Sequence, residues 1–125
     1  MNHLMTLLLN PSRKGAKVQI SPAQMVLIKK HLRVDHDDED DLIKGYAESS
    51  VDYVENYCDG SLVTELTPAA EDKEPPREVL FSPGIWQAML LLIGHYYANR
   101  EAVGESQTEI PLGVEALLYR HRKWH

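Results

Sequence analysis

The fold depends above all on residues 82–124, which read SPGIWQAMLLLIGHYYANREAVGESQTEIPLGVEALLYRHRKW. Ser82 is a suitable N-cap, and Pro83 suits the first position of a helix. A helix that is apolar nearly all round is either central in a core or shared with a partner. Gly104 breaks this helix, and Pro111 begins a further short one. The apolar residues of the long helix cover more than half of its circumference: Ile85, Trp86, Met89, Leu90, Leu92, Ile93, Tyr96 and Tyr97.

A second long helix is predicted within HLRVDHDDEDDLIKGYAESSVDYVENYCDG, residues 31–60. Asp35 or Asp37 can cap its start, and the acids that follow suit the positive end of the helix dipole. Gly60 is placed to end it. Two adjacent rows predict a wide buried face: Leu42, Tyr46, Tyr53 and Tyr57, beside Ile43, Ala47, Val51, Val54 and Cys58.

An earlier helix begins at Ser21, where Pro22 occupies the first position and Gln24 completes a capping box. Residues 61–81 contain three prolines and predict a long loop, in which SLVTEL and REVLF form short extended pieces. We therefore predict an all-α fold, a small bundle of about four helices with a proline-bearing loop between helices two and three. Residues 1–17 are a flexible N-terminal extension, and residues 18–125 form a single helical domain.

Composition narrows the class of protein. The 125 residues fit one domain, and a hydrophobic content of 43% supports a packed core. The net charge of −6 is unfavourable for wrapping nucleic acid, since such binding relies on Lys and Arg at phosphates. The lone Cys58 excludes an intrachain disulfide and is expected to be buried. No apolar run approaches the roughly 18 to 20 residues of a membrane span, and the N-terminus lacks a secretory signal. We expect a soluble protein made inside the cell.

No motif of known catalytic chemistry is present. Counted from Asp35 as a calcium loop, the sixth position is Asp40 and the twelfth is Tyr46, where Gly and Glu are needed. The six histidines form no HExxH pair and no zinc-spaced cluster, and there is no GxSxG or GxxxxGK[ST]. We predict that the protein is not an enzyme and holds no metal or cofactor, and that the acid run is a helix start with a solvated face.

The order of the segments LRVD followed by acids, YVENY, HYYANREAV and PLGVEALL resembles the head–tail connector (head-completion adaptor) proteins of tailed bacteriophages and prophages. The resemblance covers about residues 18–124. It implies an all-helical subunit that binds beneath the portal, assembles into a ring expected to be dodecameric, and extends the DNA channel. Such a ring offers a docking surface to the next neck or tail protein. DNA passes through without specific binding, no membrane is involved, and the protein moves from the host cytoplasm to the head–tail junction of the virion.

Three sets of site residues follow from this resemblance. The tail residues Arg120, Arg122, Lys123 and Trp124 are candidate portal contacts. Trp86, Tyr97 and Arg100 are candidate subunit-interface residues, although Trp86 also suits a core and Arg100 suits an ion pair with Glu101 or Glu115.

The candidate channel-facing acids are Asp37, Asp38, Glu39 and Asp40, with the loop of Glu71 to Glu74. Two alternative functions stay open: another neck or tail-completion protein, and a small helical DNA-binding regulator, for which residues 83–98 are too apolar.

Overall fold

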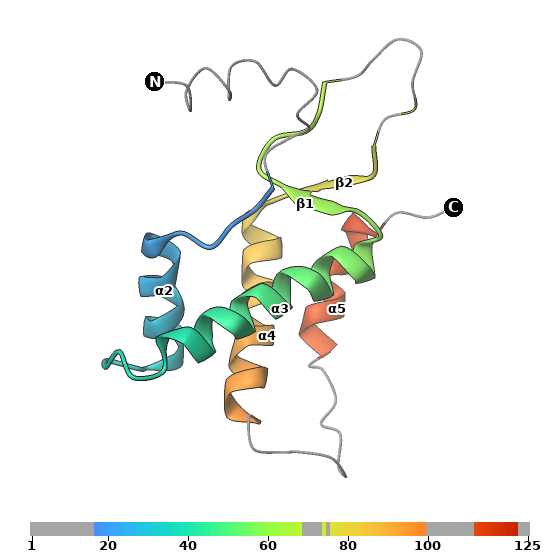
Figure 1. The fold of residues 1–125 in the computed structure, drawn as a ribbon. Coiled ribbons are helices and arrows are strands. Elements are labelled where there is room, and N and C mark those ends of the chain that lie inside the picture. The colour runs from blue at the N-terminus through green and yellow to red at the C-terminus, as the bar shows by residue number, and fades with distance from the viewer. Residues whose placement is uncertain (1–16, 69–73, 75, 100–111, 123–125) are drawn as a thin grey trace, which may run out of the picture.

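The computed structural model describes residues 17–68, 74, 76–99 and 112–122. Its helices are α2 (Pro22–Leu32), α3 (Asp40–Cys58), α4 (Pro83–Ala98) and α5 (Leu112–Leu118), followed by the 3-10 turn η1 (Tyr119–His121). The strands β1 (Ser61–Val63) and β2 (Glu78–Leu80) form a small sheet. In Figure 1, α2 and α5 flank α4, α3 crosses in front of them, and the sheet covers the end where α4 begins. The predicted helical bundle is confirmed.

Helix α4 is the centre of the core, which is one of the two placements that its all-round apolar sequence allows. Its residues Ile85, Ala88, Met89 and Leu92 join a cluster that reaches α3, α5 and both strands. Ile93 joins a second cluster with Ile28 of α2 and two residues of α3, Ile43 and Ala47. Each fully buried aliphatic side chain contributes about 1.5–3 kcal/mol to folding. Cys58 is fully buried in the first cluster, as expected.

The starts of α2 and α4 follow the local sequence. Ser21 Oγ accepts a hydrogen bond from Gln24 N at 3.1 Å, and Gln24 Oε1 accepts one from Ser21 N at 2.9 Å, which is the predicted capping box. Ser82 Oγ accepts from Ile85 N at 3.4 Å, so the predicted cap of α4 is also present. The expected helix break at Gly104 and helix start at Pro111 lie outside the described residues.

Both ends of α3 differ from the prediction. The N-cap is Glu39, which makes no side-chain cap bond, so Asp35 and Asp37 do not cap this helix. Asp37 instead pairs with Lys29 of α2, a partner that local sequence does not reveal. At the other end, Asp59 and not Gly60 adopts the left-handed conformation, with φ of 59°. Gly60 lies against the next segment, where a Cβ atom would stand 3.3 Å from the carbonyl of Arg77.

The wide buried face predicted for α3 is narrower in the structure. One row is buried at Ile43, Ala47, Val54 and Cys58, together with Ser50, whose hydroxyl donates to Ala47 O at 2.6 Å. Leu42 is exposed, and the tyrosines of its row are half-buried, as is Val51 of the other row. The prediction was wrong for the tyrosine row because the neighbouring elements cover only one side of α3, and amphipathic tyrosine rings suit its margin.

The two short extended pieces predicted in the loop are confirmed as strands that pair in parallel. Their register is Ser61 with Glu78, Leu62 with Val79 and Val63 with Leu80. Lys17 adds an isolated antiparallel bridge to Val63 on the other edge of β1. The preceding residues 1–16 of the proposed flexible extension lie outside the described residues. No described helix is long and apolar enough to cross a bilayer.

Two carboxylates fasten this sheet to the rest of the fold. Glu55 Oε2, near the end of α3, accepts hydrogen bonds at 2.8 Å from both Leu62 N and Lys17 Nζ. Glu78, which is buried, accepts from Thr67 N at 2.8 Å and from Thr67 Oγ1 at 2.6 Å. An ion pair between Arg77 and Asp59 adds a further tie at the surface. Glu55 thus joins β1 to α3, whereas Glu78 joins β2 to the loop after β1 and Arg77 joins it to the end of α3.

Candidate interaction surfaces

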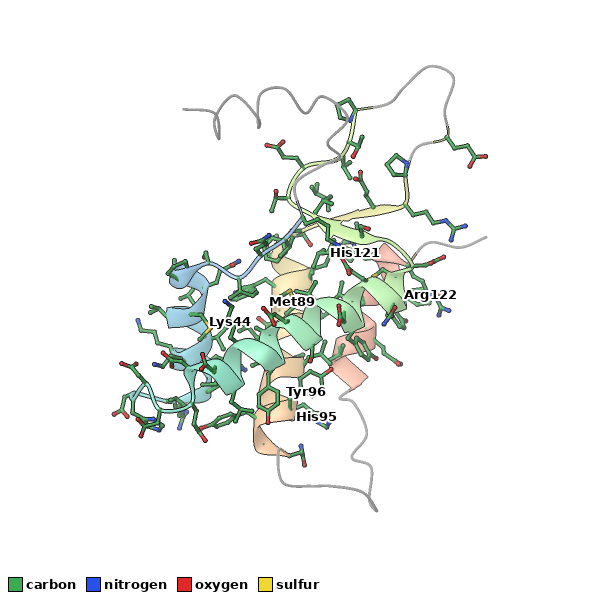
Figure 2. All side chains as sticks on the ribbon, viewed as in Figure 1. Lys44, Met89, His95, Tyr96, His121 and Arg122 are labelled. Carbon is green, nitrogen blue, oxygen red and sulfur yellow. The ribbon has the colours of Figure 1, made fainter. Side chains whose placement is uncertain are left out.

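The C-terminal tail is held against the end of α3. Arg120 and Arg122 are exposed, and the guanidinium carbon of Arg122 lies 5.1 Å from the centroid of the Tyr57 ring, within cation–π range. Figure 2 shows Arg122 beside the end of α3, with His121 closer to the sheet. The structure therefore places two of the four candidate portal contacts on one ordered turn. Lys123 and Trp124 lie outside the described residues.

A hollow of about 320 Å³ lies between this tail and β2. Leu66 and Leu80 line it and are 56% and 46% exposed, which is high for leucine. Arg120, His121 and Arg122 line the opposite side. The hollow thus combines apolar side chains with positive charge, a composition suited to a protein partner. Sequence reasoning identified the tail but missed Leu66 and Leu80, since both lie in the loop region.

A second hollow, of about 360 Å³, lies between α2 and the start of α4. It is mainly apolar, with Leu27, Phe81, Pro83 and Trp86 in its lining. Trp86 is half-buried and meets Phe81 edge-on, with ring centroids 6.2 Å apart. Trp86 packs against both core clusters, so it is a core residue and a surface residue at once. Val26 and Leu27 extend the apolar surface along the outer side of α2.

Tyr97 lies at the other end of α4 from Trp86. The two residues are eleven positions apart in the helix, which corresponds to about 16 Å along the axis. Its hydroxyl donates to Glu39 Oε1 at 2.5 Å, and its ring packs on the cluster that contains Ile93. The structure therefore does not bring the candidate subunit-interface residues together. Arg100 lies outside the described residues.

The candidate channel acids form the turn between α2 and α3, and most of them have partners within the chain. Lys29 Nζ lies 2.7 Å from Asp37 Oδ1 and 2.8 Å from the buried Oδ1 of Asp40. Hydrogen bonding to Asp37 and then to Asp40 raises the pKa of Lys29, and Lys29 lowers the pKa of Asp37. Glu39 is held by Tyr97.

The remaining channel acids are less constrained. The Asp38 side chain is 92% exposed, and its nearest ionic neighbour among the described residues is His36, whose Nδ1 lies 3.9 Å from Asp38 Oδ2. Glu74 is exposed, whereas Glu71 lies outside the described residues. Asp37 also keeps most of its surface in water despite its bond to Lys29. Within the turn between α2 and α3, Asp37 and Asp38 therefore present their charge to solvent, whereas Glu39 and Asp40 fasten the start of α3.

Further acids line the outer side of α3: Asp41 belongs to the acid run noted in the sequence, whereas Glu48 and Asp52 were not singled out there. Asp41, Glu48 and Asp52 are exposed and recur at helical spacing, and no ion pair reaches them from the described residues. Asp52 lies close enough to Tyr96 to raise its pKa, although burial raises it more. Asp41 and Glu48 are seven residues apart, and Glu48 and Asp52 are four apart. This spacing places the three acids on one side of a helix and could have identified the stripe from the sequence.

Half-buried tyrosines lie between this acidic stripe and α4. Tyr46 meets Tyr96 with ring centroids 5.9 Å apart, and Tyr53 stacks on Tyr57 at 6.3 Å. Burial, followed by the charge of Glu115, raises the pKa of Tyr53. Within the described residues, no group of three or more His, Cys, Asp or Glu side chains is arranged to hold a metal ion.

Comparison with known proteins agrees with this architecture. The family model of phage gp6-like head–tail connector proteins matches residues 23–122, most of the 125-residue chain. The head completion protein gp6 of Enterobacteria phage HK97 is 27% identical over 100 residues, which cover 78% of this chain and 80% of that protein. The crystal structure of bacteriophage HK97 gp6 has the same fold, with a TM-score of 0.57 at 24% identity, covering 80% of this chain and 92% of that one. The chain therefore belongs to the family of phage gp6-like head–tail connector proteins.

Proposed function

We propose that this protein is a connector subunit that forms a ring beneath the portal at the head–tail junction of a virion. The observation that carries this proposal is the family match across residues 23–122, which spans every described helix except the first residue of α2. The ring holds twelve subunits, like the portal that it meets, and extends the DNA channel. Its far side receives the next neck or tail protein.

The surfaces of the subunit are consistent with a ring. A closed ring is built from a heterologous interface, in which two different patches of each subunit meet. The hollow lined by Leu27, Phe81 and Trp86 is one such apolar patch. We assign Trp86 to this subunit interface, and we assign Arg100 and the exposed part of Tyr97 to a second contact at the other end of α4. Arg120, Arg122, Lys123 and Trp124 contact the portal.

The acidic residues fit a channel through which DNA slides. A lumen lined by negative charge repels phosphate, so the genome passes without specific binding. Asp37 and Asp38 offer exposed charge, and Glu39 and Asp40 continue the same acidic turn. The net charge of −6 is in keeping with this role. The stripe of Asp41, Glu48 and Asp52 extends the acidic surface along α3.

A pull-down tests the proposal directly. The full-length chain is mixed with the assembled portal encoded in the same genomic cluster, and any complex is imaged by electron microscopy. We expect a ring of this chain seated on the portal. Absence of binding to an assembled portal would refute the connector role and redirect the search to tail-tube proteins. A ring of another subunit number would refute only the dodecamer.

A further inference from the structure

Among the described residues, no strand pairs with the outer edge of β2, and the register of the sheet shows which peptide groups face that edge. Ser61 N donates to Arg77 O at 2.9 Å, and Phe81 N donates to Val63 O at 2.8 Å. In a parallel pair, alternate residues direct their peptide groups toward the neighbouring strand. Residues 77, 79 and 81 therefore bond to β1, and the N–H and C=O of Leu80 point away from it. No bond to these two groups is present among the described residues.

The opposite edge of the sheet is already occupied. Val18 N donates to Leu62 O at 3.1 Å, and Leu62 N donates to Glu55 Oε2 at 2.8 Å. The peptide groups of β1 that face away from β2 are thus satisfied by the chain itself. β2 is consequently the edge at which the described sheet is able to accept another strand. Unprotected edges of this kind are sites where an extended segment of a second polypeptide adds.

The surroundings of this edge indicate the chemistry of such a segment. The 320 Å³ hollow runs beside β2, with the exposed Leu66 and Leu80 on one side and the tail on the other. Arg120 is exposed and forms no ion pair with any described residue. Glu78 also lines the hollow, but Thr67 bonds to both of its carboxylate oxygens. The available charge at the hollow is therefore positive, and the complementary segment is acidic with apolar residues.

We propose that an extended, acidic segment of the portal protein pairs with the open edge of β2 and adds a strand to the sheet. The incoming backbone bonds to the N–H and C=O of Leu80. Because side chains alternate along a strand, one set covers Leu66 and Leu80 while acidic residues reach Arg120 and Arg122. This inference rests on the proposed function, since the tail that borders the hollow is the portal contact assigned above.

The test compares two substitutions at Leu80 in the full-length chain. Leu80→Pro removes the outward N–H but none of the bonds to β1, and proline is tolerated on edge strands. Leu80→Val keeps the N–H and serves as the matched control. We expect portal affinity to be about tenfold lower for Leu80→Pro than for Leu80→Val, because both variants lose side-chain contact but only Leu80→Pro leaves a carbonyl of the added strand unpaired. Thermal melting of both variants checks that they fold.

Hydrogen exchange of the wild-type chain gives a second, mutation-free measurement. The Leu80 amide should exchange readily in the free protein and become protected on the portal. If the wild type binds portal while this amide exchanges as before, or if a folded Leu80→Pro binds normally, the strand pairing is wrong and the connector role stands. If the wild type does not bind an assembled portal, both proposals fail. If Leu80→Pro does not fold, two measurements remain to test the strand pairing. They are the exchange of the Leu80 amide and the portal affinity of Arg120→Glu, which should be lower than that of wild type.

Discussion

The hydroxyl of Tyr97 in the last turn of α4 donates a 2.5 Å hydrogen bond to Glu39, the residue that precedes α3, across 58 positions of sequence. Glu39 is the N-cap of α3 but makes no side-chain cap bond of its own. Its carboxylate is instead used to attach the start of α3 to the central helix. The pair thus links the acidic turn to the core and takes one acid away from the surface.

Replacing Tyr97 with Phe should lower the free energy of unfolding by about 1 kcal/mol, because a hydrogen bond to a carboxylate is lost at a half-buried site. Urea denaturation measures the change. Tyr46→Phe is the matched control, since Tyr46 is also half-buried and no hydrogen bond of its hydroxyl occurs among the described residues. Equal stability of Tyr97→Phe and wild type would show that the bond contributes nothing.

Trp86→Ala should affect both folding and assembly. A fully buried aromatic residue costs about 3–5 kcal/mol when truncated, and we expect about 2 kcal/mol here because Trp86 is half-buried. Ring formation on the portal should also be lost. Leu27→Ala separates the two effects: Leu27 is 49% exposed, so its loss should change stability by less than about 0.5 kcal/mol and still weaken assembly. Normal assembly of both variants would place the subunit interface elsewhere.

The Lys29–Asp37 pair predicts a dependence of stability on pH. Lys29 lowers the pKa of Asp37, so the stabilisation is present above the unfolded value of 3.8 and is lost as pH falls through the lower folded pKa. The pKa of Lys29 is raised, so its contribution is present below 10.5 and is lost as pH rises through the folded pKa. Asp37→Asn should therefore melt below wild type near neutral pH and converge with it in strong acid.

Thermal unfolding of both proteins across pH measures this convergence. Asp38→Asn is the control, because Asp38 forms no ion pair with Lys29. A melting difference between Asp37→Asn and wild type that persists unchanged at acid pH would contradict the assignment. Exposure of Asp37 to solvent and salt makes the effect small, and it should diminish at high ionic strength.

Truncation after Leu118 should leave a folded helical subunit that no longer binds portal. Leu118 is fully buried and stays, whereas the exposed Arg120 and Arg122 are removed. Circular dichroism checks the fold, and the portal pull-down measures binding. The double variant Arg120→Glu, Arg122→Glu keeps the chain length and should bind as poorly. A truncated protein that binds portal normally would show that the tail is not the contact.

Features that depend on near neighbours could be predicted from the order of the amino acids. The caps at Ser21 and Ser82 act within three residues, and the apolar character of α4 already identified the central helix. Burial of the Ile43 row followed from helical periodicity. The two short strands could also be predicted as extended pieces, because the prolines of residues 61–81 and the helices on either side of this segment mark its limits.

Contacts between side chains far apart in the sequence could be identified only from the packed fold. By sequence alone Asp37 is a possible helix cap, but the packing of α2 places Lys29 beside it. Glu39 has no distinguishing feature in the sequence, but α4 places the hydroxyl of Tyr97 within hydrogen-bond distance of it. Helical period alone predicts the tyrosines of α3 to be core, yet α4 and the C-terminal turn cover them only in part and leave them half-buried. The parallel pairing that leaves Leu80 open likewise depends on where the loop returns. Helical period and capping report local geometry, whereas these contacts depend on the packing of whole elements.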